Sequence, residues 1–311
     1  MDSKINILIA TYNGEQFLQE QLESLFQQSY TNWKLLIHDD GSTDNTINII
    51  KDYILKYPDK IQFFDDKLNF GSALVNFSFL LEKSNAKYIM FCDQDDIWLP
   101  NKIELTVKKM QELERENPNI PLLIHTDLKV VDSNLNVLSN SYWSYQGIDP
   151  QYDTLNRLLV QNIITGCTVM INRKLGDIAL PIPNEVIMHD WWLGLVASVF
   201  GQIHSIDIPT ILYRQHDNND TGASSFNIGT ILNKAKNLSE VDLKKYINQA
   251  MPLLERYDDK LSTEQKILLK DFIAIEKQSW LQSKQTLLKH KILKQNIIRN
   301  LGLLLCRKVK K

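Results

Sequence analysis

The sequence predicts an α/β fold in which helices flank a mostly parallel central sheet. Over the first hundred residues, apolar strand candidates alternate four times with helical patterns, and each strand candidate ends in a polar loop. Such alternation is typical of parallel sheets with one ligand-binding edge. From about residue 226 the apolar spacing becomes helical. We therefore predict a sheet-based domain over residues 1–225 and a helical C-terminal region over residues 226–311.

The composition limits the classes of protein to which the chain can belong. With 311 residues and 43% hydrophobic content, the chain can bury a full core. A net charge of −2 gives no pull toward nucleic acid. The three cysteines are widely separated, which favours free thiols in a reducing compartment. The first apolar run is too short for a signal peptide and no stretch suits a membrane span, so we expect a cytoplasmic protein.

The first strand candidate, Ile5 to Ala10, ends in Thr11-Tyr-Asn-Gly and is followed by apolar positions at helical spacing. Ligands of such sheets bind beyond the carboxyl ends of the strands. The polar side chains of this loop are therefore candidates for ligand contact, namely Thr11, Tyr12, Asn13 and Glu15. A plain helix N-terminus would also explain them.

The second strand candidate, Trp33 to His38, ends in Asp39-Asp-Gly-Ser-Thr-Asp, and a helix follows. A cap explains Asp44, whereas Asp40 is placed to accept a hydrogen bond from a ribose hydroxyl or a base N–H. The third strand candidate, residues 61–64, precedes Asn69-Phe-Gly and another helix.

The fourth strand candidate, Tyr88 to Cys92, is apolar throughout, and three carboxylates follow it at Asp93, Asp95 and Asp96. Carboxylates crowded at the end of a buried strand repel one another, and a divalent cation relieves that repulsion. The pattern suits Mg²⁺ or Mn²⁺ carrying a diphosphate. The alternative is a solvated acidic turn in which Asp95 or Asp96 caps a helix. Pro100 is expected at the first position of the next helix.

Two further strands are expected at Leu122 to Val131 and at residues 162–171. The Thr165-Gly166 step within the second permits a bulge or close approach of a ligand. Asp127 is expected to serve ordinary loop chemistry. The chain contains no Gly-x-Gly-x-x-Gly and no Walker loop, which disfavours the usual dinucleotide and P-loop sites.

A helix is predicted to begin at Met188-His-Asp-Trp-Trp, which places Asp190 in its first turn, where the helix dipole favours a carboxylate. Trp191 and Trp192 offer flat faces for an acceptor sugar, although at least one is expected in the core. We expect His189 to be a core histidine. An ordinary helix-start Asp with two core tryptophans is the alternative.

A last strand candidate, Ile206 to Arg214, leads into Gln215-His-Asp-Asn-Asn. Arg214 and His216 are suited to bind diphosphate oxygens or to close over a metal, and a surface loop with an ion pair is the alternative. Residues 286–311 carry cations interleaved with leucine and isoleucine and contain no acidic residue. This pattern predicts a basic amphipathic tail that lies on anionic membrane, or else a helix packed on the domain.

Three motifs in this order and spacing resemble the nucleotide-sugar domain of inverting family-2 glycosyltransferases, which have the GT-A fold. They are Ala10-Thr-Tyr-Asn-Gly, Asp39-Asp-Gly-Ser-Thr-Asp and Asp93-Gln-Asp-Asp-Ile-Trp-Leu-Pro. The resemblance covers roughly residues 5–225. It implies that Asp93 and Asp95 match the Asp-x-Asp of the family, with Asp95 as a direct metal ligand. It also implies that Asp190 is the general base.

Taken with the strand ends, the resemblance yields a predicted nucleotide-binding set. Its members are Thr11, Tyr12, Asn13, Glu15, Asp40, Asn69, Gly71 and Asp93. Trp191, Trp192, Arg214 and His216 are expected around the diphosphate and the acceptor. The implied cofactor is Mg²⁺ or Mn²⁺.

The motifs around Asp96, Asp190 and His216 most resemble bacterial rhamnosyltransferases that build surface polysaccharides. The resemblance implies transfer of rhamnose from dTDP-rhamnose to a lipid-linked glycan at the inner face of the plasma membrane. A UDP-hexose donor would use the same chemistry. Two other classes of protein stay open. One is a sugar nucleotidyltransferase, which would be expected to carry a glycine-rich N-terminal loop. The other is a non-catalytic glycan-binding protein.

Overall fold

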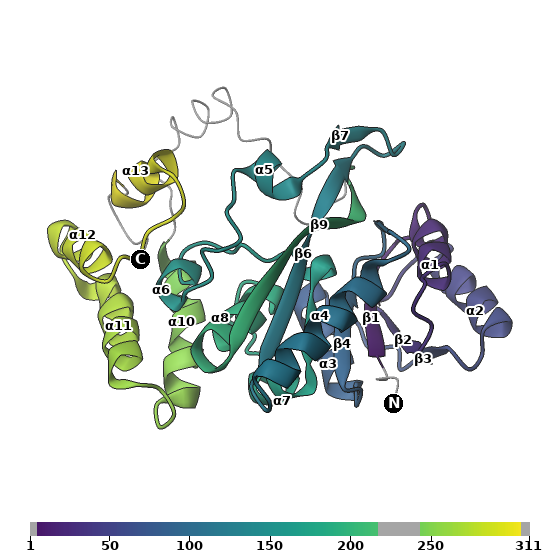
Figure 1. The fold of residues 1–311 in the computed structure, drawn as a ribbon, viewed down its shortest axis with the longest axis horizontal. Coiled ribbons are helices and arrows are strands. Elements are labelled where there is room, and N and C mark those ends of the chain that lie inside the picture. The colour runs from purple at the N-terminus through teal and green to yellow at the C-terminus, as the bar shows by residue number, and fades with distance from the viewer. Residues whose placement is uncertain (1–4, 217–242, 306–311) are drawn as a thin grey trace.

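A computed structural model describes residues 5–216 and 243–305 and places a nine-stranded sheet at the centre of the molecule (Figure 1). The strand order is β3-β2-β1-β4-β8-β6-β9-β5, and β7 pairs with β6 outside this path. The strands are β1 (Ile5–Thr11), β2 (Trp33–Asp39), β3 (Ile61–Phe64), β4 (Tyr88–Cys92), β5 (Ile97–Trp98), β6 (Leu122–Val131), β7 (Val137–Ser139), β8 (Met170–Asn172) and β9 (Gln202–Arg214).

Helices cover the sheet and form the C-terminal part of the chain. The helices before residue 217 are α1 (Leu18–Phe26), α2 (Thr46–Lys56), α3 (Ala73–Lys83), α4 (Lys102–Glu116), α5 (Tyr142–Gln146), α6 (Leu155–Leu158), η1 (Gly166–Thr168), α7 (Arg173–Ala179) and α8 (His189–Phe200). Those after residue 242 are α10 (Leu243–Tyr257), α11 (Thr263–Ala274), η3 (Ile275–Lys277), α12 (Trp280–Lys289) and α13 (Ile297–Leu305).

The N-terminal half of the sheet is parallel, as the alternation of strands and helices predicts. Strands β3, β2, β1 and β4 pair in parallel, so their carboxyl ends meet at one edge. Every residue of β4 is buried, which explains its continuous apolar sequence. The polar loops after β1, β2 and β4 therefore lie together.

The C-terminal half of the sheet is mixed. Strand β8 runs antiparallel to both β4 and β6, whereas β6 and β9 are parallel to each other. The strand predicted over residues 162–171 was mostly wrong, because only the last residues pair, in β8, and η1 precedes them. Helix α4 begins at Lys102 after Asn101, so Pro100 precedes the helix rather than opening it.

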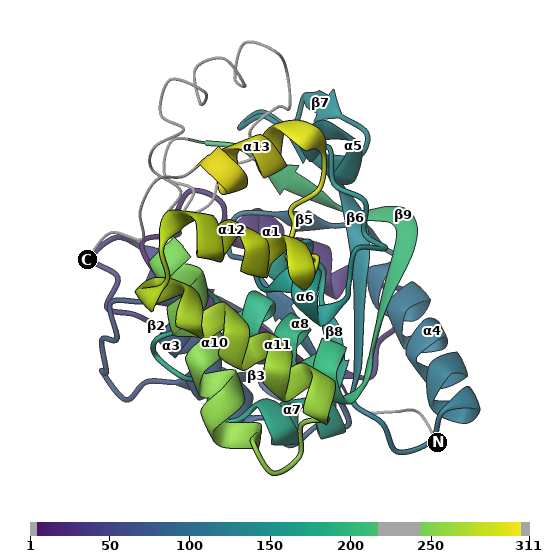
Figure 2. The same ribbon diagram turned by 90° about the vertical axis from the view of Figure 1, so that its left-hand side faces the viewer.

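The C-terminal helices pack on the sheet domain and share its core (Figure 2). Ile247 and Leu253 of α10 and Phe272 of α11 belong to the same buried cluster as Trp192 of α8. The boundary predicted between residues 225 and 226 lies outside the described residues. Trp280 opens α12 behind a capping box at Ser279.

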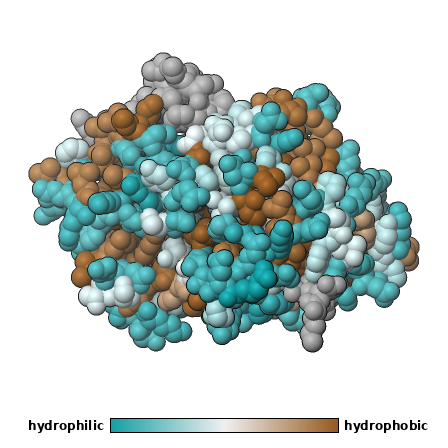
Figure 3. Space-filling view, viewed as in Figure 1, coloured by the Kyte–Doolittle hydropathy of each residue, from teal (hydrophilic) through white to brown (hydrophobic). Residues whose placement is uncertain are grey.

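Apolar side chains gather on the surface over α12 and α13 (Figure 3). None of the helices within residues 5–216 and 243–305 has the length and apolar content needed to cross a bilayer. Cys92 and Cys167 are buried free thiols, as predicted, while Cys306 lies outside the described residues.

Candidate active site

The loops after β1 and β2 are joined by hydrogen bonds at the carboxyl edge of the sheet. Thr11 Oγ1 donates to Asp39 Oδ2 at 2.8 Å, and Asp39 Oδ1 accepts the backbone N–H groups of Gly41 and Ser42. Asn13 has a positive φ of 45° and its side-chain oxygen accepts the Thr43 N–H at 2.8 Å. Thr11 and Asn13 thus shape the loops, and Asp39 is the residue that organises them.

Asp40 connects β2 to the predicted loop of residues 69–71. Its carboxylate accepts the backbone N–H groups of Phe70 and Ser72. Gly41 has φ of +84°, and a Cβ there would lie 2.6 Å from the Asn69 side chain, so the close packing of this loop requires glycine. Gly71 also has a positive φ, of 61°. The structure therefore places the loop of Asn69 and Gly71 beside Asp40.

Tyr12 and Glu15 lie in the loop between β1 and α1. The Tyr12 side chain is 56% exposed, so its ring is available to a ligand. Glu15 Oε2 accepts the Asn45 N–H at 2.8 Å, in front of α2. Gln94 holds the Tyr12 backbone from both sides, accepting its N–H at 3.0 Å and donating to its carbonyl at 2.9 Å. Sequence reasoning missed Gln94, whose only signal was its position between Asp93 and Asp95.

The acidic residues after β4 form a partly buried cluster. One ligand atom each from Asp93, Asp96 and Cys167 lies within 4.8 Å of the others. Asp96 is fully buried, and burial together with Asp95 and Asp93 raises the pKa of its carboxyl well above the usual range. Asp96 Oδ1 accepts the Arg214 N–H at 3.1 Å. Asp96 is therefore a buried anchor for the end of β9, neither a solvated turn residue nor a helix cap.

Asp95 faces the residues after β9. Its Oδ2 lies 2.8 Å from His216 Nε2, and both side chains keep some exposure, 17% for Asp95 and 16% for His216. The His216 ring packs on Phe17 with centroids 4.9 Å apart. The structure thus brings together the two residues that were expected near the metal from opposite ends of the domain.

Arg214 does not lie where a diphosphate would reach it. It is 2% exposed, and its guanidinium donates to the carbonyls of Asp95 and Ser133 and pairs with Glu20. The guanidinium also lies over the Phe17 ring, 4.4 Å from its centroid. These contacts make Arg214 a residue that joins β9 to α1 and to the acidic loop.

Asp190 lies in the first turn of α8, as predicted. Its Oδ1 accepts the Trp191 N–H at 2.6 Å, and Asn162 Nδ2 donates to its Oδ2 at 3.3 Å. Burial raises the pKa of Asp190 to about 6, although its hydrogen bonds act in the opposite direction. A carboxylate with a pKa near neutrality is suited to take a proton from a hydroxyl.

The short helix η1 connects Asp190 to the acidic cluster. A Cβ added to Gly166 would lie 3.7 Å from Asp190 Cβ and 3.1 Å from His189 Nε2. The next residue, Cys167, contacts Asp96. The Thr165-Gly166 step, which was predicted to permit a bulge or the close approach of a ligand, instead leads into η1 and lies against His189 and Asp190.

Both tryptophans of α8 are buried, which corrects their expected role as acceptor platforms. Trp191 Nε1 donates to the Leu158 carbonyl, and Trp192 Nε1 donates to the Ala179 carbonyl. Since each ring is at most 8% exposed, neither offers a face to a sugar.

His189 is a core residue, as expected. Its ring lies between Phe77 and Phe91, with centroids 4.3 Å and 4.9 Å away. Among the described residues neither ring nitrogen has a hydrogen-bond partner, and burial lowers the pKa of His189 to about 3. The packing of His189 on Phe91 of β4 places Asp190 near the end of that strand.

Asp127 is also buried and accepts the Tyr142 N–H at the start of α5, so it orders a helix rather than an ordinary loop.

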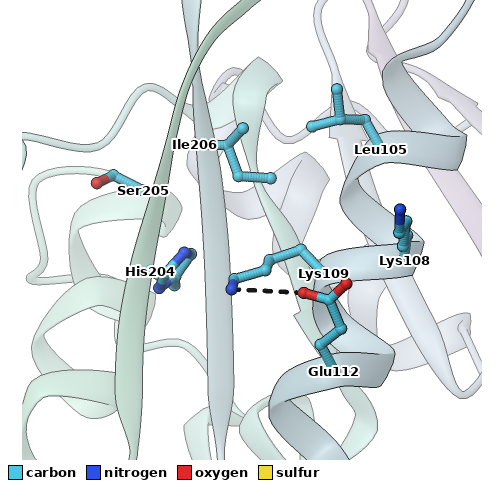
Figure 4. Close-up of a pocket in the computed structure, with 7 residues that line it drawn as sticks. All are labelled: Leu105, Lys108, Lys109, Glu112, His204, Ser205 and Ile206. Atoms are coloured by element: carbon cyan, nitrogen blue, oxygen red, sulfur yellow. Dashed lines mark ion pairs between the residues drawn. The ribbon is translucent and has the colours of Figure 1, made fainter.

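A surface hollow of about 340 Å³ lies elsewhere, between α4 and β9 (Figure 4). Its lining residues are Leu105, Lys108, Lys109, Glu112, His204, Ser205 and Ile206. None of them belongs to the loops after β1, β2 and β4, so this hollow is separate from the predicted site.

The residues after β4 and β9 fit a divalent cation. Asp93 belongs with Asp96 and Cys167 to a group of possible donor atoms within 4.8 Å of one another, and Asp95 places a carboxylate 2.8 Å from the imidazole of His216. Burial raises the pKa of the Asp96 carboxyl and of the Cys167 thiol well above their usual values, so each would have to lose its proton to bind a cation. Asp93 and Asp95, with His216 beside Asp95, are the candidates that keep some exposure.

Comparisons with known proteins identify the family of the chain. A family model described as "Glycosyl transferase family 2" matches residues 6–171. The "dTDP-rhamnosyl transferase RfbG" of Shigella flexneri is 33% identical over 227 residues, 70% of this chain and 74% of that protein. The "UDP-Glc:alpha-D-GlcNAc-diphosphoundecaprenol beta-1,3-glucosyltransferase WfgD" of Escherichia coli is 28% identical over 193 residues, 61% of this chain and 69% of that protein.

Solved structures show the same fold. S. aureus TarS 1-349 in complex with UDP-GlcNAc has a TM-score of 0.53 at 18% identity, covering 93% of this chain and 87% of that one. The mannosyltransferase PcManGT from Pyrobaculum calidifontis, in complex with GDP-Man and Mn²⁺, has a TM-score of 0.54 at 14% identity, covering 94% and 74%. The GT-A architecture expected from the sequence is thereby confirmed.

Proposed function

The chain belongs to glycosyl transferase family 2, and we propose that this glycosyltransferase moves L-rhamnose from dTDP-rhamnose to a hydroxyl of a growing bacterial surface polysaccharide, with inversion at the anomeric carbon. The rhamnosyl donor is supported by the 33% identity to a dTDP-rhamnosyl transferase. A UDP-hexose donor is the second candidate, supported by the similarity to a glucosyltransferase that uses UDP-Glc.

The observation that carries the proposed mechanism is the placement of Asp190 and the acidic cluster on two sides of η1. An inverting transfer needs a base on the acceptor side and charge stabilisation on the opposite side, where the nucleoside diphosphate leaves. Asp190 takes the proton of the acceptor hydroxyl as its oxygen bonds to the anomeric carbon. The bond to the diphosphate breaks, and its electron pair leaves with the nucleotide.

Asp93, Asp95 and His216 are the residues that would hold Mn²⁺ or Mg²⁺, and the cation supplies neutralisation of the leaving diphosphate. Asp95 and His216 come from different strands, so their pairing also orients the end of β9 over the acidic loop. Arg214 also holds the end of β9 in place, because its backbone N–H donates to Asp96 and its guanidinium donates to the Asp95 carbonyl.

The proposed nucleotide surface is formed by the loops after β1, β2, β3 and β4. Its members are Thr11, Tyr12, Asn13, Glu15, Asp40, Asn69, Gly71 and Asp93. The exposed Tyr12 ring is suited to stack on a base, and the hydrogen bonds at Asp39 and Asp40 preorganise the surrounding backbone.

We further propose a lipid-linked acceptor, supported by the diphosphoundecaprenol substrate in the name of the E. coli relative. Such an acceptor would place the enzyme at the inner face of the plasma membrane. Residues 1–225 would then carry the donor and acceptor sites, and residues 226–311 would form the extension that faces the lipid.

The test is hydrolysis and transfer with a panel of dTDP- and UDP-sugars, in Mg²⁺, Mn²⁺ or EDTA. Slow hydrolysis selective for dTDP-rhamnose would support the rhamnosyl donor, and selectivity for UDP-glucose would support the second candidate. Loss of turnover on chelation would support the metal site. Consumption of a nucleoside triphosphate with a sugar 1-phosphate, or no turnover of any nucleotide sugar, would contradict the proposal.

A further inference from the structure

Helices α12 and α13 expose an unusual number of large apolar side chains (Figure 3). We call this set the α12–α13 surface. Its members, with exposed fractions between 41% and 77%, are Trp280, Leu281, Leu288, Ile297, Ile298, Leu301 and Leu305. Single exposed apolar residues are common on proteins, but a group of seven on two adjoining helices marks a binding surface. Lys284 Nζ donates to the Leu303 carbonyl at 3.2 Å, which joins the two helices.

Several cations of this region are engaged in internal contacts. Lys294 Nζ donates to the Tyr246 hydroxyl at 3.2 Å, and Arg299 donates to the Gly147 carbonyl at 2.9 Å. Lys289 pairs with Asp271 at 2.8 Å. Residues 286–305 are therefore not a free basic helix, because they pack on the domain through their cations and present apolar side chains outward.

The charge around this surface is one-sided. After Glu276 the sequence contains no acidic residue. The same stretch contains ten cations, namely Lys277, Lys284, Lys289, Lys291, Lys294, Arg299, Arg307, Lys308, Lys310 and Lys311. Four of them come after Leu305 and lie outside the described residues. An apolar surface on a stretch of chain whose only charged residues are cations complements an anionic bilayer, whereas pairing of two copies through it would bring like charges together.

The surface is linked to the proposed base through α5. Arg299 of α13 binds the carbonyls that end α5, and Tyr142 at the start of α5 interacts electrostatically with both Arg299 and Asp190.

We propose that the α12–α13 surface inserts into the headgroup region of an anionic bilayer, with Trp280 at the interface, and presents the acceptor side of the site to the membrane. The proposal rests on the proposed function only for the identity of the acceptor. The membrane contact is driven by apolar insertion of folded helices as well as by the cations of the tail.

The first test is co-sedimentation of the full chain with vesicles of phosphatidylcholine, with and without phosphatidylglycerol. The double variant Ile297→Ser and Leu301→Ser removes apolar area without changing charge. It is expected to weaken binding to anionic vesicles by about tenfold. The matched control is Leu55→Ser, since Leu55 is 82% exposed on α2, far from α12 and α13 (Figure 1). Equal binding of both variants would overturn the proposal.

The second test uses Trp280 as an internal probe. The other five tryptophans are at most 8% exposed, so quenching by brominated lipid should report Trp280 and should disappear in Trp280→Phe. Vesicle binding without quenching would show a purely electrostatic contact and would contradict insertion. A dimer that forms without vesicles and is lost in the double variant would assign the surface to a second copy instead.

Hydrolysis of soluble nucleotide sugar separates this proposal from the proposed function. The Ile297→Ser and Leu301→Ser variant should keep donor hydrolysis unchanged. If vesicle binding occurs but no nucleotide sugar is turned over, the proposed function fails and the membrane surface stands.

Discussion

Asp95 and His216 lie 121 residues apart in the chain, yet their side chains meet at 2.8 Å at the carboxyl edge of the sheet. The contact joins the loop after β4 to the second residue after β9. The Phe17 ring packs on both the His216 ring and the Arg214 guanidinium, which helps to fix the position of the histidine. The pair supplies the imidazole and the carboxylate that we propose as metal donors.

Replacement of His216 by alanine should raise the Mn²⁺ concentration needed for half-maximal donor hydrolysis by about ten- to a hundredfold, because one donor is removed. The measurement is a Mn²⁺ titration of hydrolysis. His290→Ala is the control, since His290 also pairs with an aspartate, Asp271 at 2.7 Å, but in the helical region. An unchanged Mn²⁺ requirement in His216→Ala would remove His216 from the metal site.

Replacement of Asp190 by asparagine should abolish sugar transfer while stabilising the protein at alkaline pH. Burial raises the folded-state pKa of Asp190 from 3.8 to about 6, so folding disfavours its ionised form. The stability that Asp190 contributes is therefore present below its unfolded pKa and lost as pH rises through about 6. At pH 8 the variant should gain about 1–3 kcal/mol in free energy of unfolding.

Urea unfolding of both proteins at pH 8 and pH 4 measures this difference, which should nearly vanish at pH 4. Transfer that survives in the variant would exclude Asp190 as the base. A loss of stability at pH 8 would instead show that the ionised carboxylate holds the fold together.

The pH dependence of transfer should show an acid limb near pH 6, where Asp190 becomes protonated and cannot accept a proton. Asn162→Ala should move this limb to higher pH, because the hydrogen bond from Asn162 lowers the pKa of Asp190. The profile of kcat/KM against pH checks both. A lower overall rate with an unmoved limb would leave Asn162 with a purely structural role.

His189→Phe should be tolerated at neutral pH and should make the protein more resistant to acid. The folded-state pKa of His189 is lowered to about 3, so the stability it contributes is present above its unfolded pKa of 6.5 and declines as pH falls toward 3. At pH 4.5 the variant should be more stable by about 2–3 kcal/mol. Denaturant unfolding at pH 7 and pH 4.5 tests this.

His125 is also buried with a pKa lowered to about 3, and it is present in both proteins, so the comparison isolates His189. Retained donor hydrolysis in His189→Phe would agree with the core position of the ring between Phe77 and Phe91. A complete loss of hydrolysis with normal stability would point to a ligand contact that the buried ring does not suggest.

Much of the N-terminal half could be predicted because its signals are local. Strands β1, β2 and β4 are continuous apolar runs, and each is followed by polar residues, so both the strand and the ligand edge can be read from adjacent positions. The start of α8 and the position of Asp190 in its first turn follow from the same kind of signal.

The errors occurred where distant segments decide the outcome. Residues 162–169 are as apolar as a strand, but only the three residues that follow them, in β8, pair with β4 and β6. The segment before β8 turns through η1 and approaches Asp190. Arg214, Trp191 and Trp192 have residue types that suit ligands, yet each is buried with its polar atoms bonded to protein. The residues adjacent in the sequence do not indicate that these three side chains are buried.

The sequence by itself determined the alternating fold, the acidic strand end and the helix-start Asp190, because hydrophobic periodicity and residue chemistry act over a few adjacent positions. The tertiary structure decided which of those groups meet. Chain folding brought His216 to Asp95, placed Cys167 beside Asp96, used the cations of residues 284–299 to fasten α12 and α13, and left their apolar faces outward. Contacts of this kind depend on packing between segments far apart in the chain, and no local pattern encodes them.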